Sequence, residues 1–595
     1  MNKILLLCSI LGFAMISEAQ EYFPKNDGLK EENNNYTAFT NANLYITPSN
    51  IVNNGTLLIQ NGKVVASGRN VNLPANTIVV DLAGKYVYPS FIEAYSGFGI
   101  EKPKRASGQG RPPQYDASRE GFYWNDHIMP EIDGISSFKY DEKKAKELRE
   151  AGFGVVNTHL MDGIARGTGV LVALNDAGGD QDRVLDDESG QFFSFTKSVA
   201  KRQSYPSSLM GAMALLRQLH HDLDWYAKGN ANTKDRSLEA MIENKNLVSF
   251  FEAGDKSNDL RADKISDQFN LNYVIVGGGD EYETIEQIKG TNASYIIPLD
   301  FPAAFDVTDP YQAKYISLED MRDWNQAPTN LKVLSENGVR FSLTTHELDK
   351  VSEFHTNLRK AIKYGFNKTK ALEALTTVPA GLLGKSAMLG TLEKGKQANF
   401  LIASGDIFEK ETTLYENWVQ GKPHVINDKD QRDLRGNYNL SAGGKIFQMK
   451  ITGEVSKPKS EITLGETKYP SKMSYEGDWI TFSFNSEDKS ETYAATAKIP
   501  KQGNVFSGRL ILASGSESSF SANRTGDVEE KEEEDKEENG VPEVVPITYP
   551  NVGYGFNVKP QPQNVLFRNA TVWTGEEAGI LTNTDVLVKN GKISK

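Results

Sequence analysis

The chain has 595 residues, with 66 basic and 79 acidic side chains and a formal net charge of −13. This length exceeds what one hydrophobic core supports, so several folded units are expected. The acidic balance argues against nucleic-acid binding, and the charged and apolar fractions, 24% and 38%, are those of an ordinary globular protein.

Residues 1–19 predict a Sec-type signal peptide. Lys3 gives the positive start, residues 4–16 form the apolar core, and residues 17–19 provide a small-x-small cleavage pattern. The apolar run is too short to span a bilayer, so we expect an exported protein, periplasmic or secreted, without a transmembrane segment. Cys8 is the only cysteine and lies in this run, which excludes disulfides and cysteine-based sites from the mature chain.

The middle of the chain predicts an α/β fold. Residues 37–88 alternate short β-like runs with turns, and Asn61-Gly62 between apolar runs is a strong hairpin signal. From residue 89 to 389, apolar runs alternate with helical patterns, which favours a TIM-like (β/α)₈ barrel. The predicted strands are Gly154–Thr158, Leu247–Phe251, Tyr273–Val276, Tyr295–Pro298 and Arg340–Leu343, and the predicted helices are Tyr140–Ala151, Ser208–His221, Thr284–Lys289, Ala327–Asn337 and Glu353–Tyr364.

The last third of the chain differs in its sequence pattern. Residues 390–425 return to strand-like sequence, and residues 440–525 are rich in strands and turns, as in a small all-β domain. Residues 526–562 read as an acidic, disordered linker, because Asp527–Glu538 holds nine acids and two lysines.

One internal repeat stands out. "TNANLYITPSNIVNNGTLLIQNGKVVASG" (40–68) recurs as "RNATVWTGEEAGILTNTDVLVKNGKISK" (568–595). The offset is 528 at Asn41 and 529 at Asn61, so the second copy carries one inserted residue. A repeat at this distance indicates duplicated domains. Residues 563–595 are therefore expected to begin a second β-sandwich that is truncated here, since so few strands cannot bury a core.

Five segments carry a family resemblance: the opening "NAN…IQNGKV", "DLAGKYVYPSFIEA", "GVRFSLTTH", "ALEALTTVPAGLLG" and the closing "LGTLEKGKQANFLI". Together they resemble the amidohydrolase superfamily, in its imidazolonepropionase-like branch. The resemblance covers roughly residues 37–425 and resumes at 565–595. It implies a metal-dependent barrel at 89–389 flanked by a composite β-sandwich from residues 37–88 and 390–425, and it makes the chain the N-terminal, degenerate copy of a tandem amidohydrolase.

The resemblance also implies where metal ligands would lie. Such proteins carry His-x-His at the end of the first barrel strand, further His from middle strands and an Asp after the last, which together hold one or two divalent ions. In this chain the two His positions fall on Tyr95 and Gly97, a third on Glu252, and the Asp position on His346. We therefore expect the metal site to be degenerate, with no metal or other cofactor in this chain and zinc only in an intact family site.

A rebuilt site is the alternative. His159 and His346 each follow a predicted barrel strand, and Glu252 could join them, so these three residues are the candidate catalytic group. The competing interpretation treats them as packed polar residues at the mouth of the barrel.

Two functions remain open. The first is a hydrolase of carbon–nitrogen bonds, in non-peptide or small peptide-like amides, with catalysis in a second barrel beyond Lys595 and a small molecule as substrate of the whole protein. The second is a non-catalytic binding or scaffold module on the same fold. In both, we expect this barrel to pack against a second one.

Overall fold

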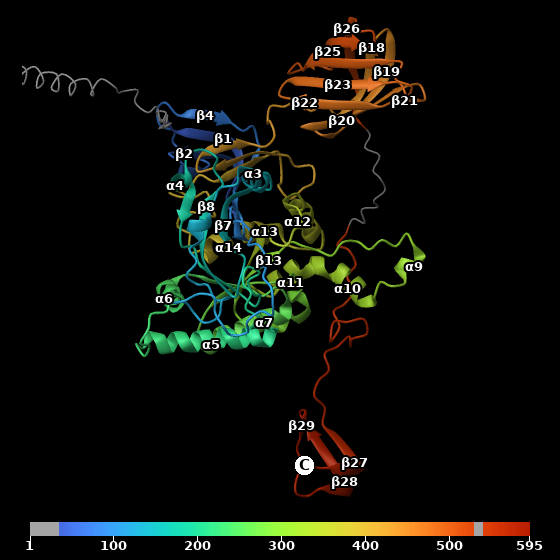
Figure 1. Cartoon of the computed structure of the whole chain (residues 1–595). Coiled ribbons are helices and arrows are strands. Elements are labelled where there is room, and N and C mark those ends of the chain that lie inside the picture. The colour runs from blue at the N-terminus through green and yellow to red at the C-terminus, as the bar shows by residue number, and fades with distance from the viewer. Residues whose placement is uncertain (1–34, 529–539) are drawn as a thin grey trace, which may run out of the picture.

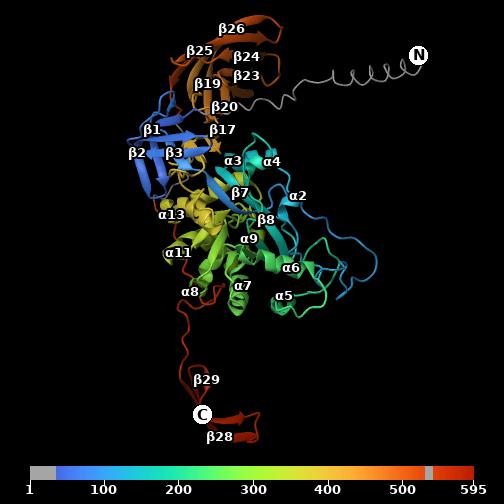
Figure 2. The same cartoon turned by 90° about the vertical axis from the view of Figure 1, so that its left-hand side faces the viewer.

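The structure is a computed structural model that describes residues 35–528 and 540–595 (Figures 1 and 2). The predicted signal peptide and residues 529–539 of the acidic segment lie outside the described residues. Among the helices of the two described ranges, none is long and apolar enough to cross a membrane.

A β-sheet from both flanks of the barrel lies at one end of the molecule. Its order is β17-β16-β15-β5-β1-β2-β3, with β4 beside β1. β5 pairs antiparallel with β15, Val87 opposite Ile402, so the segments before and after the barrel share one sheet, as expected. The strands are β1 (Thr37–Thr47), β2 (Asn50–Gln60), β3 (Lys63–Gly68), β4 (Ile78–Asp81), β5 (Tyr86–Pro89), β15 (Phe400–Ala403), β16 (Leu414–Val419) and β17 (Lys422–Val425).

A nearly closed barrel follows, which confirms the predicted fold class. Eight strands follow the order β14-β13-β12-β11-β10-β8-β7-β6, and β9 pairs with β8. The strands are β6 (Phe91–Ser96), β7 (Phe153–His159), β8 (Ala165–Ala173), β9 (Val184–Asp186), β10 (Gln191–Ser194), β11 (Ser249–Glu252), β12 (Tyr273–Val276), β13 (Ser294–Pro298) and β14 (Phe341–Thr344).

One carboxylate bridges the first and last strands of the barrel. Glu93 on β6 is fully buried, and its Oε1 accepts hydrogen bonds from the Tyr95 backbone N–H at 3.1 Å and the Thr344 hydroxyl at 2.5 Å. Its Oε2 accepts from the backbone N–H and the hydroxyl of Thr345 at 2.7 and 2.8 Å. Four donors therefore compensate the burial of one charge and hold β14 against β6.

We expect the substitution Glu93→Gln to destabilise the barrel. The amide group would replace one acceptor oxygen, leaving two buried donors unpaired and facing an NH₂, which costs about 1–3 kcal/mol. Urea unfolding of the two proteins measures the difference. An unchanged unfolding midpoint would show that Glu93 does not hold the two strands together.

The barrel departs from a strict (β/α)₈ pattern at β8. Five residues separate the end of β7 from the start of β8, and the two strands pair antiparallel, His159 opposite Gly169. A crossover to a parallel strand needs a dozen or more residues, so this short connection forces a hairpin. β8 also pairs antiparallel with β10 and with β9, whereas the remaining neighbouring pairs of the barrel run parallel.

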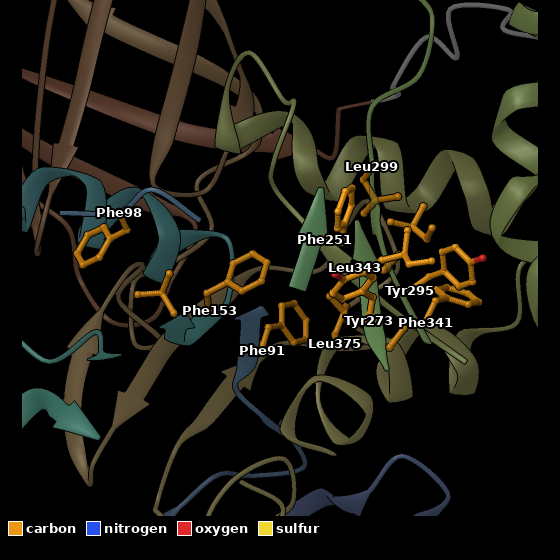
Figure 3. Packing of buried hydrophobic residues seen from close by; sticks show 14 of the residues in the cluster. Phe91, Phe98, Phe153, Phe251, Tyr273, Tyr295, Leu299, Phe341, Leu343 and Leu375 are labelled. Carbon is orange, nitrogen blue, oxygen red and sulfur yellow. The ribbon is translucent and has the colours of Figure 1, made fainter. Parts of the chain in front are cut away.

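Helices surround the barrel and close its core. Asp141, Ser208 and Asp255 cap three of them by accepting backbone N–H groups of the first turn. Figure 3 shows Phe251, Tyr273 and Tyr295 of successive strands packed under the helical layer, with Leu375 among them. The helices are α2 (Gly134–Ser137), α3 (Glu142–Glu150), α4 (Asp180–Arg183), α5 (Leu209–Ala227), α6 (Arg236–Glu243), α7 (Lys256–Phe269), α8 (Ile285–Gly290), α9 (Pro310–Ala313), α10 (Leu318–Gln326), α11 (Asn330–Glu336), α12 (Phe354–Lys363), α13 (Lys368–Leu375) and α14 (Thr377–Leu382), with 3₁₀ turns η1 (Asn244–Asn246), η2 (Glu281–Thr284), η3 (Ala327–Thr329) and η4 (Val351–Glu353).

A separate all-β domain follows the sandwich, as predicted. Its nine strands form one antiparallel sheet, and Ser460 and Ser471 hydrogen-bond across the ends of that sheet. Phe447, Phe484 and Tyr493 are among the aromatic side chains that fill its interior. The strands are β18 (Gly436–Ala442), β19 (Lys445–Glu454), β20 (Lys457–Leu464), β21 (Thr467–Tyr469), β22 (Ser471–Glu476), β23 (Trp479–Asn485), β24 (Thr492–Lys498), β25 (Val505–Leu512) and β26 (Glu517–Gly526).

The last strands have the geometry of the first ones. β27 (Val565–Trp573), β28 (Ile580–Lys589) and β29 (Lys592–Ile593) form a three-stranded sheet. Its register equals that of β1–β3 at the repeat offsets: Ala42 opposes Gly55 and Ala570 opposes Thr584, while Thr37 opposes Ile59 and Val565 opposes Val588. Asn41, Asn54 and Asn61 have positive φ angles of 56°, 54° and 49°, and their counterparts Asn569, Asn583 and Asn590 have 57°, 54° and 49°.

Candidate functional site

The candidate site lies at the mouth of the barrel, where the parallel strands end. Tyr95 comes from β6, Glu252 ends β11, and His346 follows β14. Arg166 comes from the second position of β8. Because β8 runs antiparallel to its neighbours, its beginning lies beside the ends of β7 and β10, which brings Arg166 to the same mouth.

Arg166, Tyr95 and Glu252 form a closed polar network. The Arg166 Nη1 lies 2.5 Å from Glu252 Oε2 and donates to the Tyr95 hydroxyl at 2.8 Å. The Tyr95 hydroxyl in turn donates to Glu252 Oε2 at 2.8 Å. The Arg166 and Tyr95 side chains are buried and take polar partners from one another and from Glu252, and Arg166 Nε also donates to the Gly163 carbonyl at 3.0 Å.

The charges of this network are fixed at neutral pH. Burial favours the neutral form of the Glu252 carboxyl, but the Arg166 guanidinium and His346 outweigh it and hold the pKa of Glu252 well below its usual range. Burial raises the pKa of the Tyr95 hydroxyl far above its usual value. Glu252 is therefore a carboxylate, Tyr95 a neutral phenol, and Arg166 a guanidinium cation.

His346 is held as an imidazolium between two carboxylates. Its Nε2 lies 3.1 Å from Glu347 Oε1 and 3.7 Å from Glu252 Oε1. Burial lowers the pKa of the imidazole, but Glu252 and Glu347 outweigh burial and raise it to about 9. At pH 7 the ring carries a proton on the nitrogen that faces both acids.

His159 is near this group without joining it. Its ring stacks on Phe192 at 3.7 Å between ring centroids and lies 4.7 Å from the ring of Tyr95. Neither ring nitrogen reaches a hydrogen-bond partner, and burial together with the Arg166 charge lowers the pKa of His159 well below its usual value. Of the three candidates from the sequence, the structure brings Glu252 and His346 into contact and leaves His159 as a neutral ring packed among aromatic residues.

The residues that would hold the implied metals do not fit that role. Gly97 offers no ligand atom, and a Cβ there would lie 3.1 Å from Met161 Sδ, so the space is filled. The Tyr95 hydroxyl and Glu252 Oε2 are both bound to Arg166. A guanidinium thus stands where a divalent cation would need its carboxylate ligand.

A smaller donor set remains on the outer side of Glu252. One oxygen each of Glu252 and Glu347 and a ring nitrogen of His346 lie within 4.8 Å of one another. Three such ligands suit zinc in kind. However, a metal there would have to displace the proton of His346 next to the fixed charge of Arg166, and the Glu347 side chain is 57% exposed.

Arg166 is the site residue that sequence reasoning missed. It lies in "GIARGTGVLVAL", which has the glycine content of a loop but forms β8. A single arginine in an otherwise apolar and glycine-rich run was the available signal. Such a charge stays buried only with a partner, and the partner is Glu252.

The comparisons with known proteins support the fold. Residues 326–436 match the amidohydrolase family, and none of the curated proteins matches the chain. An amidohydrolase from Thermotoga maritima MSB8 has a similar structure, with 21% identity, a TM-score of 0.51, and coverage of 65% of this chain and 99% of that chain. Another amidohydrolase shows 13% identity, a TM-score of 0.41 and coverage of 66% and 100%, and a prolidase complexed with N-methylphosphonate-L-proline shows 12%, 0.40, and 66% and 99%.

Proposed function

We propose that residues 89–389 form an amidohydrolase-type barrel that has lost its metal centre. It belongs to an exported hydrolase of carbon–nitrogen bonds, in the imidazolonepropionase-like branch, that acts on a small-molecule amide. Catalysis takes place in a second barrel, whose sandwich begins with β27–β29. The observation that carries this proposal is the ion pair between the Arg166 guanidinium and Glu252 Oε2.

Charge balance supports the loss of the metal. A divalent centre needs deprotonated ligands around a compact positive charge. Here Arg166 supplies that positive charge through a side chain, and its planar donor group binds one carboxylate oxygen and one phenol together. Because this positive charge belongs to a side chain, the charges at the mouth of the barrel are balanced without a metal ion. Under this proposal the mouth therefore lacks a metal-activated water.

The repeated hairpin supports the second barrel. β1–β3 open the sandwich that leads into the barrel, and β27–β29 have the same register and the same left-handed asparagines. Under this proposal the first barrel serves as a scaffold for the second one, which unites the two functions that the sequence leaves open.

Metal analysis of the purified chain tests the loss of the metal centre. After incubation with excess zinc and removal of free ions, we expect far less than one zinc per chain, because Arg166 competes for Glu252. The control is His346→Ala, which is expected to leave that low content unchanged. One zinc per chain that disappears in His346→Ala would instead establish a rebuilt site at Glu252, His346 and Glu347.

The second barrel has its own test in the coding sequence. In the first copy, Tyr95 lies 32 residues after Lys63, and Lys592 is the counterpart of Lys63. A His-x-His pair is therefore due about thirty residues after Lys592 if the second copy follows the same spacing. A continuing reading frame without this pair would contradict catalysis in the second copy.

A further inference from the structure

The segment that precedes β27 is bound to the barrel. We call residues 541–556 the strap. The strap runs past α10 and η3 on its way from the all-β domain to β27 (Figure 1). The Val545 backbone donates its N–H to Asn325 Oδ1 at 2.8 Å, while Asn325 Nδ2 donates to the Glu543 carbonyl at 3.0 Å.

Gln326 is the centre of this attachment. Its side chain is 1% exposed, and its Nε2 donates to the carbonyls of Val545 and Pro546 at 3.0 and 3.1 Å. Its Oε1 accepts from Asn551 Nδ2 at 2.8 Å. Thr548 of the strap is only 2% exposed. A buried amide with every polar atom paired to the strap fixes this segment in place.

Beside the strap, a second segment projects from the barrel. We call residues 301–317 the arm. It carries α9, extends beyond α10 and the strap in Figure 1, and is mostly exposed. Tyr311 and Tyr315 of the arm are 76% and 89% exposed.

The strap contacts Leu318, the residue that follows the arm at the start of α10. A Cβ at Gly553 of the strap would lie 3.6 Å from the Leu318 Cβ. Tyr554 and Phe556, which follow in the strap, are 95% and 65% exposed. A group of large apolar and aromatic side chains on adjoining segments is typical of an interaction surface.

We propose that the arm and the strap form the docking surface for the domain that begins with β27–β29. This inference rests on the proposed function, because that domain is the second amidohydrolase copy. This surface adjoins the contact between the strap and Gln326 of the barrel. The strap belongs to both, because it is bound to the barrel and also carries the exposed residues Tyr554 and Phe556.

The short connection between the strap and β27 favours the domain that begins with β27–β29 as the occupant of this surface. Only residues 557–564 separate the strap from β27. The connection contains Pro560 and Pro562, and an extended proline-rich segment of this length spans about 25 Å, which keeps the following domain near the surface at an effective concentration on the order of millimolar. A free partner would have to exceed that concentration to compete.

Hydroxyl-radical labelling of the complete encoded protein tests the docking. A dissociation constant about tenfold below the effective concentration gives a docked fraction of about 90%. Docking to this extent is expected to slow the labelling of Tyr311, Tyr315 and Tyr554 about tenfold. Tyr115, which is 58% exposed elsewhere on the barrel, is the internal reference.

Paired variants make the result specific. Tyr311→Ser with Tyr315→Ser should return Tyr554 to the labelling rate of Tyr115, because docking is lost. Met210→Ser with Trp225→Ser, at exposed apolar positions of α5, should leave Tyr554 protected.

The possible outcomes separate the two proposals. If the complete protein hydrolyses amides but its three tyrosines react as fast as Tyr115, the docking surface is wrong and the proposed function stands. If the tyrosines are protected but no second barrel follows β27–β29, the proposed function is wrong and the protection has another occupant, which also overturns this docking assignment.

Discussion

Replacing Arg166 with methionine is expected to destabilise the barrel by about 2–3 kcal/mol, because it leaves the partly buried Glu252 carboxylate and the buried Tyr95 phenol without their donor. The Glu252 carboxylate keeps only the Tyr95 hydroxyl and the more distant His346. Urea unfolding followed by tryptophan fluorescence measures the loss. Arg217→Met is the matched control, since Arg217 lies on α5 and bonds only the neutral Gln268; its cost should stay below about 1 kcal/mol.

A second variant separates the ion pair from packing. In Arg166→Met with Glu252→Leu, no charge remains unpaired, so the double variant should be more stable than Arg166→Met alone. If Arg166→Met and Arg217→Met cost the same, the network does not hold the mouth of the barrel together.

The same substitution bears on the metal. Removing the guanidinium frees Glu252 Oε2 while His346 and Glu347 remain nearby. If the arginine is what excludes a divalent ion, zinc affinity should rise in Arg166→Met relative to the unmodified protein. The loss of stability and the gain in zinc affinity would then both result from the removal of the Arg166 guanidinium.

Much of the barrel could be predicted because its strands are short apolar runs. Tyr273–Val276 forms β12 with the predicted bounds, and the other predicted runs differ from the observed strands by at most two residues at either end. Their burial on both faces explains the continuous apolar pattern. Glu252 and His346 could be located for the same reason, since each follows such a run.

β8 could not be predicted from its sequence. Its glycines, which are uncommon inside strands, are required by close packing: Gly167 has φ 86°, and a Cβ there would lie 2.0 Å from the Ile132 carbonyl oxygen. The direction of a strand also depends on its neighbours. Arg166 reaches the mouth only because β8 is antiparallel to β7 and β10. The position of Arg166 therefore could not be predicted without the position and direction of β8.

Two polar residues of β6 have roles that concern the barrel itself. Glu93 lies two residues before Tyr95, and its four donors bridge β6 and β14. This role does not need a metal. The Tyr95 hydroxyl, at the position where the resemblance implies the first His ligand, is bound to Arg166 and Glu252. The contacts of both residues can therefore be selected for stability alone.

The charge on His346 makes stability depend on alkaline pH. The two carboxylates raise the pKa of His346 from 6.5 to about 9, so the folded state binds its proton more tightly than the unfolded state does. This stabilisation is fully present below the unfolded pKa of 6.5 and is lost as the pH rises through about 9. From that shift, the unmodified protein should lose about 3 kcal/mol more than His346→Gln between about pH 6 and pH 10.

Unfolding free energies of both proteins across that range measure the difference, and other titrating groups cancel in the comparison. His355→Gln is the control. Burial lowers the pKa of His355 to about 4, so the contribution of His355 to the unfolding free energy changes only in acid. The loss of stability at alkaline pH should therefore persist in this variant. Parallel pH curves for the unmodified protein and His346→Gln would mean that His346 is neutral in the folded state. The exclusion of a metal ion would then rest on Arg166 alone, and zinc content would have to decide between a packed neutral ring and a rebuilt site with Glu252 and Glu347.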